Sequence, residues 1–283
     1  MLQGRPVGAP FVVWGTLMQD WQQMDAAALD AAYVNVDHIP GGAAYPDHWA
    51  EAAEEFRDAE PPERLSYGDH PRQTIDLFRP IAEPKGLVVI VHGGYWRRFA
   101  PDDFSHLAIG TLARGWAAAL PGYVLAPEAT IPEITAMVRR AVDTAAEAVP
   151  GPIRLAGHSA GGHVVARLAM PDAAPGCAER IEAVLPISPV ADLRPLVPQT
   201  MNEDLRLTPE TAAAESPALG ASRPGARVSI HVGAAERPAF LWQAEALAKA
   251  WGAPLHRAEG KHHFDVIDAL SDPESAMMDD LLG

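Results

Sequence analysis

Short apolar runs alternate with amphipathic stretches from about residue 85 onward, and this alternation restricts the fold more than any other feature of the sequence. The run GLVVIVHGG, residues 86–94, is continuously apolar and rich in β-branched residues before it ends in glycines. Such a run is typical of a strand buried on both faces of a parallel sheet. Similar runs begin near residues 116, 153, 183 and 228, and each ends in small or polar residues.

Amphipathic helical patterns separate these runs. Between residues 131 and 145, and again between residues 240 and 251, apolar residues recur three or four positions apart and so share one face of a helix. Strands that alternate with helices of this length form βαβ units. We therefore predict an α/β fold with a mostly parallel central sheet and helices on both of its faces.

The domain organisation follows from where the alternation stops. We expect a single domain over residues 1–283, because no internal repeat or linker divides the chain. Residues 1–60 are predicted to form an extension of helices and loops outside the sheet. The stretches LSYG and QTIDLFRP then resemble early strands, possible partners in an antiparallel pair. Residues 192–222, rich in Pro, Thr and Glu between two strands, are the candidate for a small lid.

The amino-acid composition argues against some classes of binding partner. The 283 residues include 22 Lys and Arg against 37 Asp and Glu, and the net charge of −15 argues against nucleic acid and anionic membranes. The run PFVVWGTLM is too short and too broken for a signal peptide. Cys177 is the only cysteine, so no disulfide can form within the chain. We expect a soluble, cytoplasmic protein that acts on a small molecule, with an edge strand or the N-terminal helices available for a homodimer.

The sequence RLAGHSAGGHVV, residues 154–165, places one serine between glycines inside an apolar pattern. A strand, then Gly157-His158-Ser159-Ala160-Gly161, then a helix is the pattern of a nucleophile elbow, in which the positions two before and two after the serine must be small. The serine then stands at a helix N-terminus, where the Ala160 N–H and the helix dipole favour an oxyanion. Ser159 is therefore the candidate nucleophile.

A serine nucleophile needs a base and an acid that orients the base, and in this arrangement the acid precedes the base in the chain. The segment EGKHHFDVIDAL precedes the last predicted helix and offers two adjacent histidines, of which we favour His263 as the base over His262. The loop after VSIHVG contains one carboxylate, Glu236, which is the candidate acid. Asp192, at the end of the preceding strand, is the competing acid.

The sequence HGGYW follows the strongest predicted strand, where this arrangement supplies further backbone N–H groups to the oxyanion. Its two glycines let the backbone come close to the reacting carbonyl group. We predict an oxyanion hole made of the N–H groups of Gly94, Tyr95 and Ala160, with His92 fixing the loop by hydrogen bonds. Tyr95 and Trp96 are expected to line an apolar acyl or aryl pocket.

The remaining histidines show no pattern of metal ligands. His158 and His163 are five positions apart and so do not share a helical face, and no His-Glu-x-x-His sequence occurs. The glycine-containing motifs also fail the dinucleotide-binding and P-loop patterns. We therefore expect neither a metal ion nor a cofactor.

These motifs together resemble the kynurenine formamidase (arylformamidase) branch of the α/β-hydrolase superfamily, which neighbours the hormone-sensitive-lipase-like esterases. The resemblance extends over about residues 66–270 through HGGYW, YVLAPE, GHSAGGH, SPVADLRPL, ERPAFLWQA and HHFDVIDAL. Ser159 matches the nucleophile of that family and His263 matches its base. The family often carries an aspartate where this chain has Ala235, so either Glu236 takes over the acid's role or the triad is weakened.

The resemblance implies an α/β-hydrolase fold and the hydrolysis of N-formylkynurenine to kynurenine and formate, without a cofactor. A general carboxylesterase for small or aryl esters is the alternative within the enzymes, because fold and triad do not determine the substrate. A non-catalytic binding protein on the same fold is the alternative from another class, and the alanine at position 235 is its one support.

Overall fold

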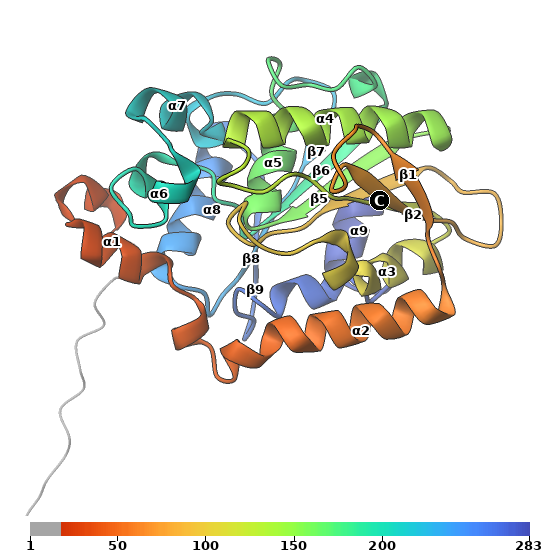
Figure 1. Cartoon of the computed structure of the whole chain (residues 1–283), viewed down its shortest axis with the longest axis horizontal. Coiled ribbons are helices and arrows are strands. Elements are labelled where there is room, and N and C mark those ends of the chain that lie inside the picture. The colour runs from red at the N-terminus through yellow and green to blue at the C-terminus, as the bar shows by residue number, and fades with distance from the viewer. Residues whose placement is uncertain (1–17) are drawn as a thin grey trace, which may run out of the picture.

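The computed structural model describes residues 18–283, and Figure 1 shows the arrangement of their helices and strands. The helices are α1 (Ala26–Tyr33), α2 (Tyr45–Ala59), α3 (Ala108–Ala113), α4 (Ile131–Ala148), α5 (Ala160–Leu168), α6 (Asn202–Leu205), α7 (Pro209–Ala214), α8 (Pro238–Trp251) and α9 (Ala276–Leu282). The strands are β1 (Glu63–Ser66), β2 (Thr74–Phe78), β3 (Leu87–Val91), β4 (Ala117–Pro121), β5 (Ile153–His158), β6 (Ile181–Ile187), β7 (Arg227–Val228), β8 (Ile230–Gly233) and β9 (Leu255–Ala258).

The described strands form one sheet in the order β1-β2-β4-β3-β5-β6-β8-β9, with the short β7 paired to β6. β1 pairs with β2, and β2 with β4, in antiparallel fashion, while every other pairing is parallel. The predicted mostly parallel sheet is therefore confirmed, together with the early antiparallel strands. Because the parallel strands point the same way, the loops after β3, β5, β6, β8 and β9 meet at one edge of the sheet.

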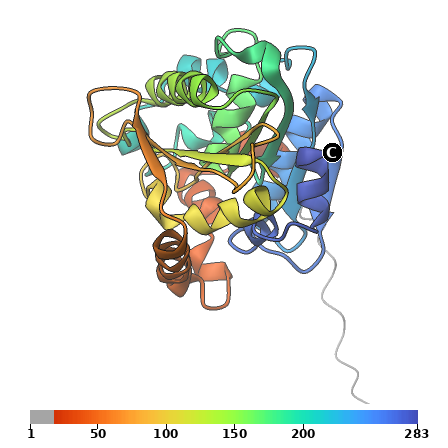
Figure 2. The ribbon, with the colours of Figure 1, turned by 90° about the vertical axis from the view of Figure 1, so that its right-hand side faces the viewer.

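The two faces of the sheet are covered by separate groups of helices, as Figures 1 and 2 show. In β3, Leu87, Val89 and Val91 join the apolar cluster under α4, α5 and the start of α8. The alternate residues Val88 and Ile90 join a second cluster with the helix α9 and the loop that precedes it. Successive strand residues point to opposite faces, so a continuous apolar run of this kind requires cover on both sides.

In the part of residues 1–60 that the structure describes, the segment before the sheet forms helices. Asp25 caps α1 by accepting a hydrogen bond from the Ala28 N–H at 2.8 Å. α2 lies along the lower side of the molecule in Figure 1 and inserts Trp49 into the second apolar cluster. This segment is therefore attached to the domain through buried aromatic contacts.

The predicted lid, residues 192–222, contains the short helices α6 and α7 between β6 and β7. It is tied to the N-terminal helices, because Thr200 donates hydrogen bonds from its N–H (2.9 Å) and its hydroxyl (2.5 Å) to the carboxylate of Asp30 in α1. α1 and α6 accordingly lie together at the left of Figure 1. Among the described helices, none combines the length and the apolar character that crossing a bilayer requires.

Candidate active site

Ser159 lies at the turn between β5 and α5. Its backbone has φ 55° and ψ −114°, and a positive φ of this kind costs a residue with a side chain about 1–3 kcal/mol. The Ser159 N–H donates to the carbonyl oxygen of Ile187 in β6 at 2.8 Å, which holds the turn against the neighbouring strand. The strained turn places the serine at the N-terminus of α5, as the elbow pattern predicts.

Close backbone contacts explain the glycines on either side of Ser159. A Cβ atom on Gly157 would lie 2.6 Å from the carbonyl carbon of Gly161, and a Cβ atom on Gly161 would lie 2.6 Å from the carbonyl oxygen of His92. Neither distance leaves room for a side chain, so the turn closes only with glycine at both positions. The same contacts bring the loop after β3 next to the elbow.

That loop almost touches Ser159. A Cβ atom on Gly93 would lie 3.1 Å from Ser159 Cβ. The next two residues both have positive φ, 97° at Gly94 and 51° at Tyr95. Among the hydrogen bonds formed by residues 18–283, none uses the N–H of Gly94, Tyr95 or Ala160 as its donor. These three N–H groups, singled out from the sequence, are thus available to a bound oxyanion.

His92 fixes the start of the loop. Its ring stacks on that of Tyr123, with the ring centroids 4.5 Å apart and the planes 10° apart. The Tyr123 hydroxyl donates to the His92 carbonyl oxygen at 3.0 Å, and His92 Nδ1 lies 2.9 Å from the carbonyl oxygen of Gly93. Burial lowers the pKa of His92 to about 4, so the neutral ring donates through Nδ1–H. His92 therefore positions the loop, the role expected from the sequence.

His263 and Glu236 form a buried pair. His263 Nδ1 lies 2.7 Å from Glu236 Oε2, and the two side chains are 4% and 0% exposed. Glu236 comes from the loop after β8 and His263 from the loop after β9. An Nδ1–H that donates to the carboxylate leaves Nε2 free to exchange a proton with a hydroxyl group.

Ser159 faces the same cavity as His263. Among the hydrogen bonds of the described residues, none joins the Ser159 hydroxyl to His263. In enzymes without bound substrate this contact is often long and tightens when the substrate binds. The nucleophile, base and acid predicted from the sequence are thus brought to one place, in the chain order acid before base.

Ser188 is a contributor that the sequence reasoning missed. It follows β6 with a positive φ of 46°, and its hydroxyl donates to Glu236 Oε1 in a short hydrogen bond. The N–H of Gly233 donates to the same oxygen at 2.8 Å. Both carboxylate oxygens are therefore occupied, which fixes the orientation of the Glu236 side chain. The sequence LPIS, in which a predicted strand ends in a hydroxyl residue, is the pattern that could have indicated Ser188.

His158, the residue before Ser159, was also missed. His158 Nε2 lies 2.8 Å from the carbonyl oxygen of His263, and the two rings are 4.7 Å apart. Burial and the neighbouring His263 lower the pKa of His158 well below its ordinary value. A neutral His158 therefore donates through Nε2–H to the backbone of the loop that carries His263, and this bond links the elbow to that loop.

The cavity beside Ser159 has a volume of about 290 Å³. One wall comes from the elbow and the loop after β3, including Tyr95 and Phe99. Residues 33–49 also line the cavity and bring Trp49 next to Phe99, and the predicted lid contributes Met201. The cavity is mainly apolar and aromatic, which is typical of sites for small organic molecules.

The comparison with known proteins identifies the fold family. The sequence profile of a family described as having the alpha/beta hydrolase fold matches residues 88–221. The solved structure of a protein from Silicibacter sp., described as a candidate thioesterase, is 49% identical to this chain. The match covers 90% of this chain and 99% of that one, with a TM-score of 0.88.

The chain belongs to the α/β-hydrolase family.

Curated relatives of this hydrolase carry the name kynurenine formamidase. The protein from Danio rerio is 27% identical over 74% of this chain and 76% of its own length, and the one from Salmo salar is 26% identical with the same coverage. An esterase from Pyrobaculum calidifontis has a similar fold, with a TM-score of 0.64 at 18% identity over 93% of this chain and 95% of that one. The chain is a hydrolase, and the resemblance noted from its motifs is confirmed.

Asp192 and His262, the alternatives for the acid and the base, have other contacts. Asp192 forms an ion pair with Arg194 at 2.7 Å and accepts the Arg194 N–H at 3.0 Å. His262 lies 3.1 Å from the Tyr45 hydroxyl through Nε2, and its Nδ1 accepts backbone N–H groups that follow it. Within residues 18–283, Asp192 contacts no histidine, and His262, whose Nδ1 lies 3.0 Å from Asp265 Oδ1, does not line the cavity of Ser159. The geometry therefore favours Glu236 over Asp192 and His263 over His262.

The structure contradicts the expected role of Trp96 in the pocket. The side chain is fully buried, belongs to the core cluster under α4 and α5, and meets the ring of His163 edge-on at 5.1 Å. Its backbone φ of 58° continues the positive values that begin at Gly94, so the chain reverses direction and the indole enters the core. Tyr95 does line the cavity, and its hydroxyl donates to the Tyr33 carbonyl oxygen at 2.7 Å.

Proposed function

We propose that this hydrolase removes the formyl group from an aryl formamide such as N-formylkynurenine, releasing formate and an aromatic amine. The observation that carries the proposal is the buried His263–Glu236 pair beside a strained serine in one aromatic cavity. The two curated relatives named kynurenine formamidase support the choice of substrate.

The proposed reaction proceeds in two halves. Ser159 Oγ attacks the formyl carbon while His263 Nε2 takes the hydroxyl proton, and the N–H groups of Gly94, Tyr95 and Ala160 stabilise the oxyanion. The C–N bond then breaks, and the leaving nitrogen receives the proton from His263. A water molecule, activated by the same imidazole, attacks the formyl-serine and releases formate. Glu236 keeps the ring oriented and stabilises its positive charge.

The cavity walls suit an aromatic substrate. Trp49, Phe99 and Phe104 form an interlocked group, with ring centroids 5.2–5.9 Å apart, on one side of the cavity. Phe264 packs against Trp49 at 5.4 Å. These rings provide flat apolar surfaces with fixed orientations, against which an aryl group can stack or pack edge-on.

Polar groups at the cavity suit the amino-acid part of N-formylkynurenine. Arg97 is paired with Asp204 at 2.5 Å, but Arg98 forms no ion pair with any described residue. Asn35 is 6% exposed, and its buried side-chain oxygen has no hydrogen-bond partner among residues 18–283. We propose that Arg98 pairs with the substrate carboxylate and that the Asn35 amide binds a second polar group of the same substrate.

A second candidate is hydrolysis of an ester or thioester at the same serine. The Silicibacter protein, at 49% identity over almost its whole length, is the observation that favours it. The two candidates share Ser159, His263 and Glu236 and differ only in what the cavity walls accept.

Steady-state kinetics on three substrates would test the proposal. We would measure kcat/KM for N-formylkynurenine, phenyl acetate and S-phenyl thioacetate, with Ser159→Ala as the blank for each. We expect the formamide to be hydrolysed with the highest kcat/KM and Ser159→Ala to lose at least about 10⁴-fold. Serine-dependent activity on the ester or thioester alone would assign the second candidate instead. Equal turnover by wild type and Ser159→Ala would contradict the serine mechanism altogether.

A further inference from the structure

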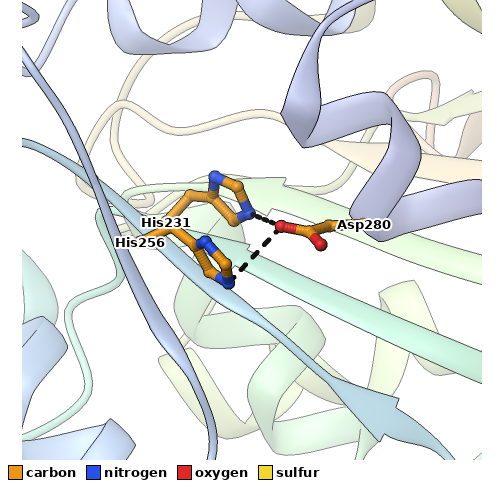
Figure 3. A group of neighbouring side chains, drawn as sticks. All are labelled: His231, His256 and Asp280. Atoms are coloured by element: carbon orange, nitrogen blue, oxygen red, sulfur yellow. Dashed lines mark hydrogen bonds and ion pairs between the residues drawn. The ribbon is translucent and has the colours of Figure 1, made fainter.

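A second group of chemically reactive side chains lies away from the cavity, between the last two strands and the last helix (Figure 3). His231 of β8 and His256 of β9 are direct neighbours in the register of the parallel pair. Their rings are stacked, with centroids 4.7 Å apart and planes 12° apart. Asp280 of α9 reaches both rings from across the sheet face, as Figure 3 shows.

The three side chains direct ligand atoms toward one point. Asp280 Oδ2 lies 2.8 Å from His231 Nε2 and 3.5 Å from His256 Nε2, and all three ligand atoms lie within 4.8 Å of one another. A tetrahedral zinc ion with bonds of about 2.0–2.2 Å requires ligand atoms about 3.3–3.6 Å apart. Small rotations of these side chains therefore suffice to enclose an ion.

The chemistry of the ligand set selects the kind of ion. Two imidazoles with one carboxylate suit Zn²⁺ and similar transition-metal ions, whereas Mg²⁺ and Ca²⁺ prefer oxygen ligands. The side chains of His256 and Asp280 are 45% and 32% exposed, which leaves an entry path and space for water as a further ligand.

From this arrangement we propose that His231, His256 and Asp280 bind one divalent transition-metal ion, Zn²⁺ in preference to Mg²⁺ or Ca²⁺. The ion acts as a clasp that joins β8, β9 and α9 and takes no part in the hydrolysis. The site lies on the side of β8 opposite Ile230 and Val232, which pack with α8 in a separate apolar cluster. It is independent of the substrate assigned to the cavity.

The proposed metal site is connected to the candidate active site through the strands that it joins. β8 leads directly into the loop of Glu236, and β9 leads into the loop of His263. The His231 carbonyl oxygen also accepts the Ser188 N–H at 2.7 Å, and the Ser188 hydroxyl donates to Glu236. An ion that holds the two strands in register therefore holds the acid and the base at their mutual distance.

Metal binding would be tested on the full chain after chelator treatment and removal of the chelator. Zn²⁺ would be titrated by calorimetry, and Co²⁺ would be added as a spectroscopic probe, since its visible absorption reports nitrogen ligands. We expect one Zn²⁺ per chain, a melting temperature that rises with Zn²⁺ and does not rise with Mg²⁺, and the spectrum of a four- or five-coordinate Co²⁺ site.

Two variants assign the ligands. His256→Ala removes a half-exposed ring and Asp280→Asn keeps the side-chain shape, and each should weaken Zn²⁺ binding by at least about 100-fold, since loss of an outer-shell partner alone costs 10–100-fold. His70→Ala is the matched control, because His70 pairs with a single carboxylate, Glu128 at 3.4 Å, and should bind Zn²⁺ as wild type does.

The outcomes separate the clasp from an ordinary hydrogen bond between His231 and Asp280. Zn²⁺ binding that is unchanged in both His256→Ala and Asp280→Asn would place the ion elsewhere, for example at His262 and His263, and would overturn the proposal. Absence of any Zn²⁺-dependent heat or shift in melting temperature in the wild type would overturn it as well. Circular dichroism of each variant confirms that a loss of binding is not a loss of fold.

Discussion

The two sides of the cavity are built by different means. The side that would perform the chemistry comes from loops at the ends of β3, β5, β8 and β9, held by short hydrogen bonds and strained turns. The side that would select the substrate comes from residues 33–49, held mainly by aromatic packing, with Trp49 at its centre. The first side is set by backbone geometry common to the family, and the second by side chains that can vary without disturbing it.

Substitution of Glu236, the proposed acid, tests the first side with the largest expected effect. Glu236→Gln should lower kcat by about 10³–10⁴-fold, because an amide cannot stabilise the charged imidazole and favours the wrong tautomer. Asp192→Asn should leave kcat within about threefold of wild type. It should lower the melting temperature, because the Asp192 carboxylate accepts hydrogen bonds from the Arg194 side chain. The reverse ranking would move the acid to Asp192.

Acid should destabilise the fold through buried histidines, of which His92 and His158 lie on the first side of the cavity. Burial is the main cause that lowers the pKa of His92 to about 4, of His163 to about 3 and of His158 well below its ordinary value. Burial also lowers the pKa of His106 to about 4. The unfolded chain binds these protons near pH 6.5 and the folded chain does not. The stability that these four groups contribute is therefore complete above about pH 7.5 and falls as the pH is lowered, by about 5 kcal/mol per pH unit below pH 6.

Urea unfolding at several pH values between 7.5 and 5 would measure this slope. His163→Gln should remove about one quarter of it, although the variant is less stable at every pH, because the slope counts only the protons that folding excludes. His48→Gln, on the exposed surface of α2, is the control that should keep the full slope. A slope that is the same in all three proteins would show that His163 titrates normally.

Substrate choice should respond to cavity side chains that do no chemistry, including Arg98 in the loop after β3. Arg98→Gln should raise KM for N-formylkynurenine about tenfold and leave kcat nearly unchanged, since the arginine is exposed and the lost contact is with the substrate carboxylate. Kinetics on phenyl acetate, which has no carboxylate, should be the same for variant and wild type. A fall in kcat on both substrates would mean that the substitution has disturbed the neighbouring Gly94–Tyr95 backbone.

The sequence predicted the first side of the cavity better than the second. Local sequence patterns predicted the elbow at Ser159, its flanking glycines and the buried strands, and they indicated Glu236 and His263 as candidates. Each of these features depends on backbone geometry that few residue types allow. Nothing local could show that residues 33–49 form a cavity wall, since that depends on how α2 docks. Trp96 was misplaced because a positive φ in a residue with a side chain leaves no mark in the sequence.

His231, His256 and Asp280 illustrate the same limit at a longer range. They are separated by 25 and 24 positions and come from two strands and a helix, so no spacing rule joins them. Only the parallel register of β8 with β9 makes the two histidines neighbours. Ser188 is a similar case, because its contact with Glu236 spans two loops that meet only at the edge of the folded sheet.

The order of the strands has a consequence for the synthesis of the chain. β9 is the last strand in the sequence and also the last in the sheet, and the loop that follows it carries His263. During translation the serine and the loop after β3 leave the ribosome more than 100 residues before the base. A nascent chain therefore holds Ser159 before His263 has been made, and the proposed mechanism can operate only when the final edge of the sheet has docked.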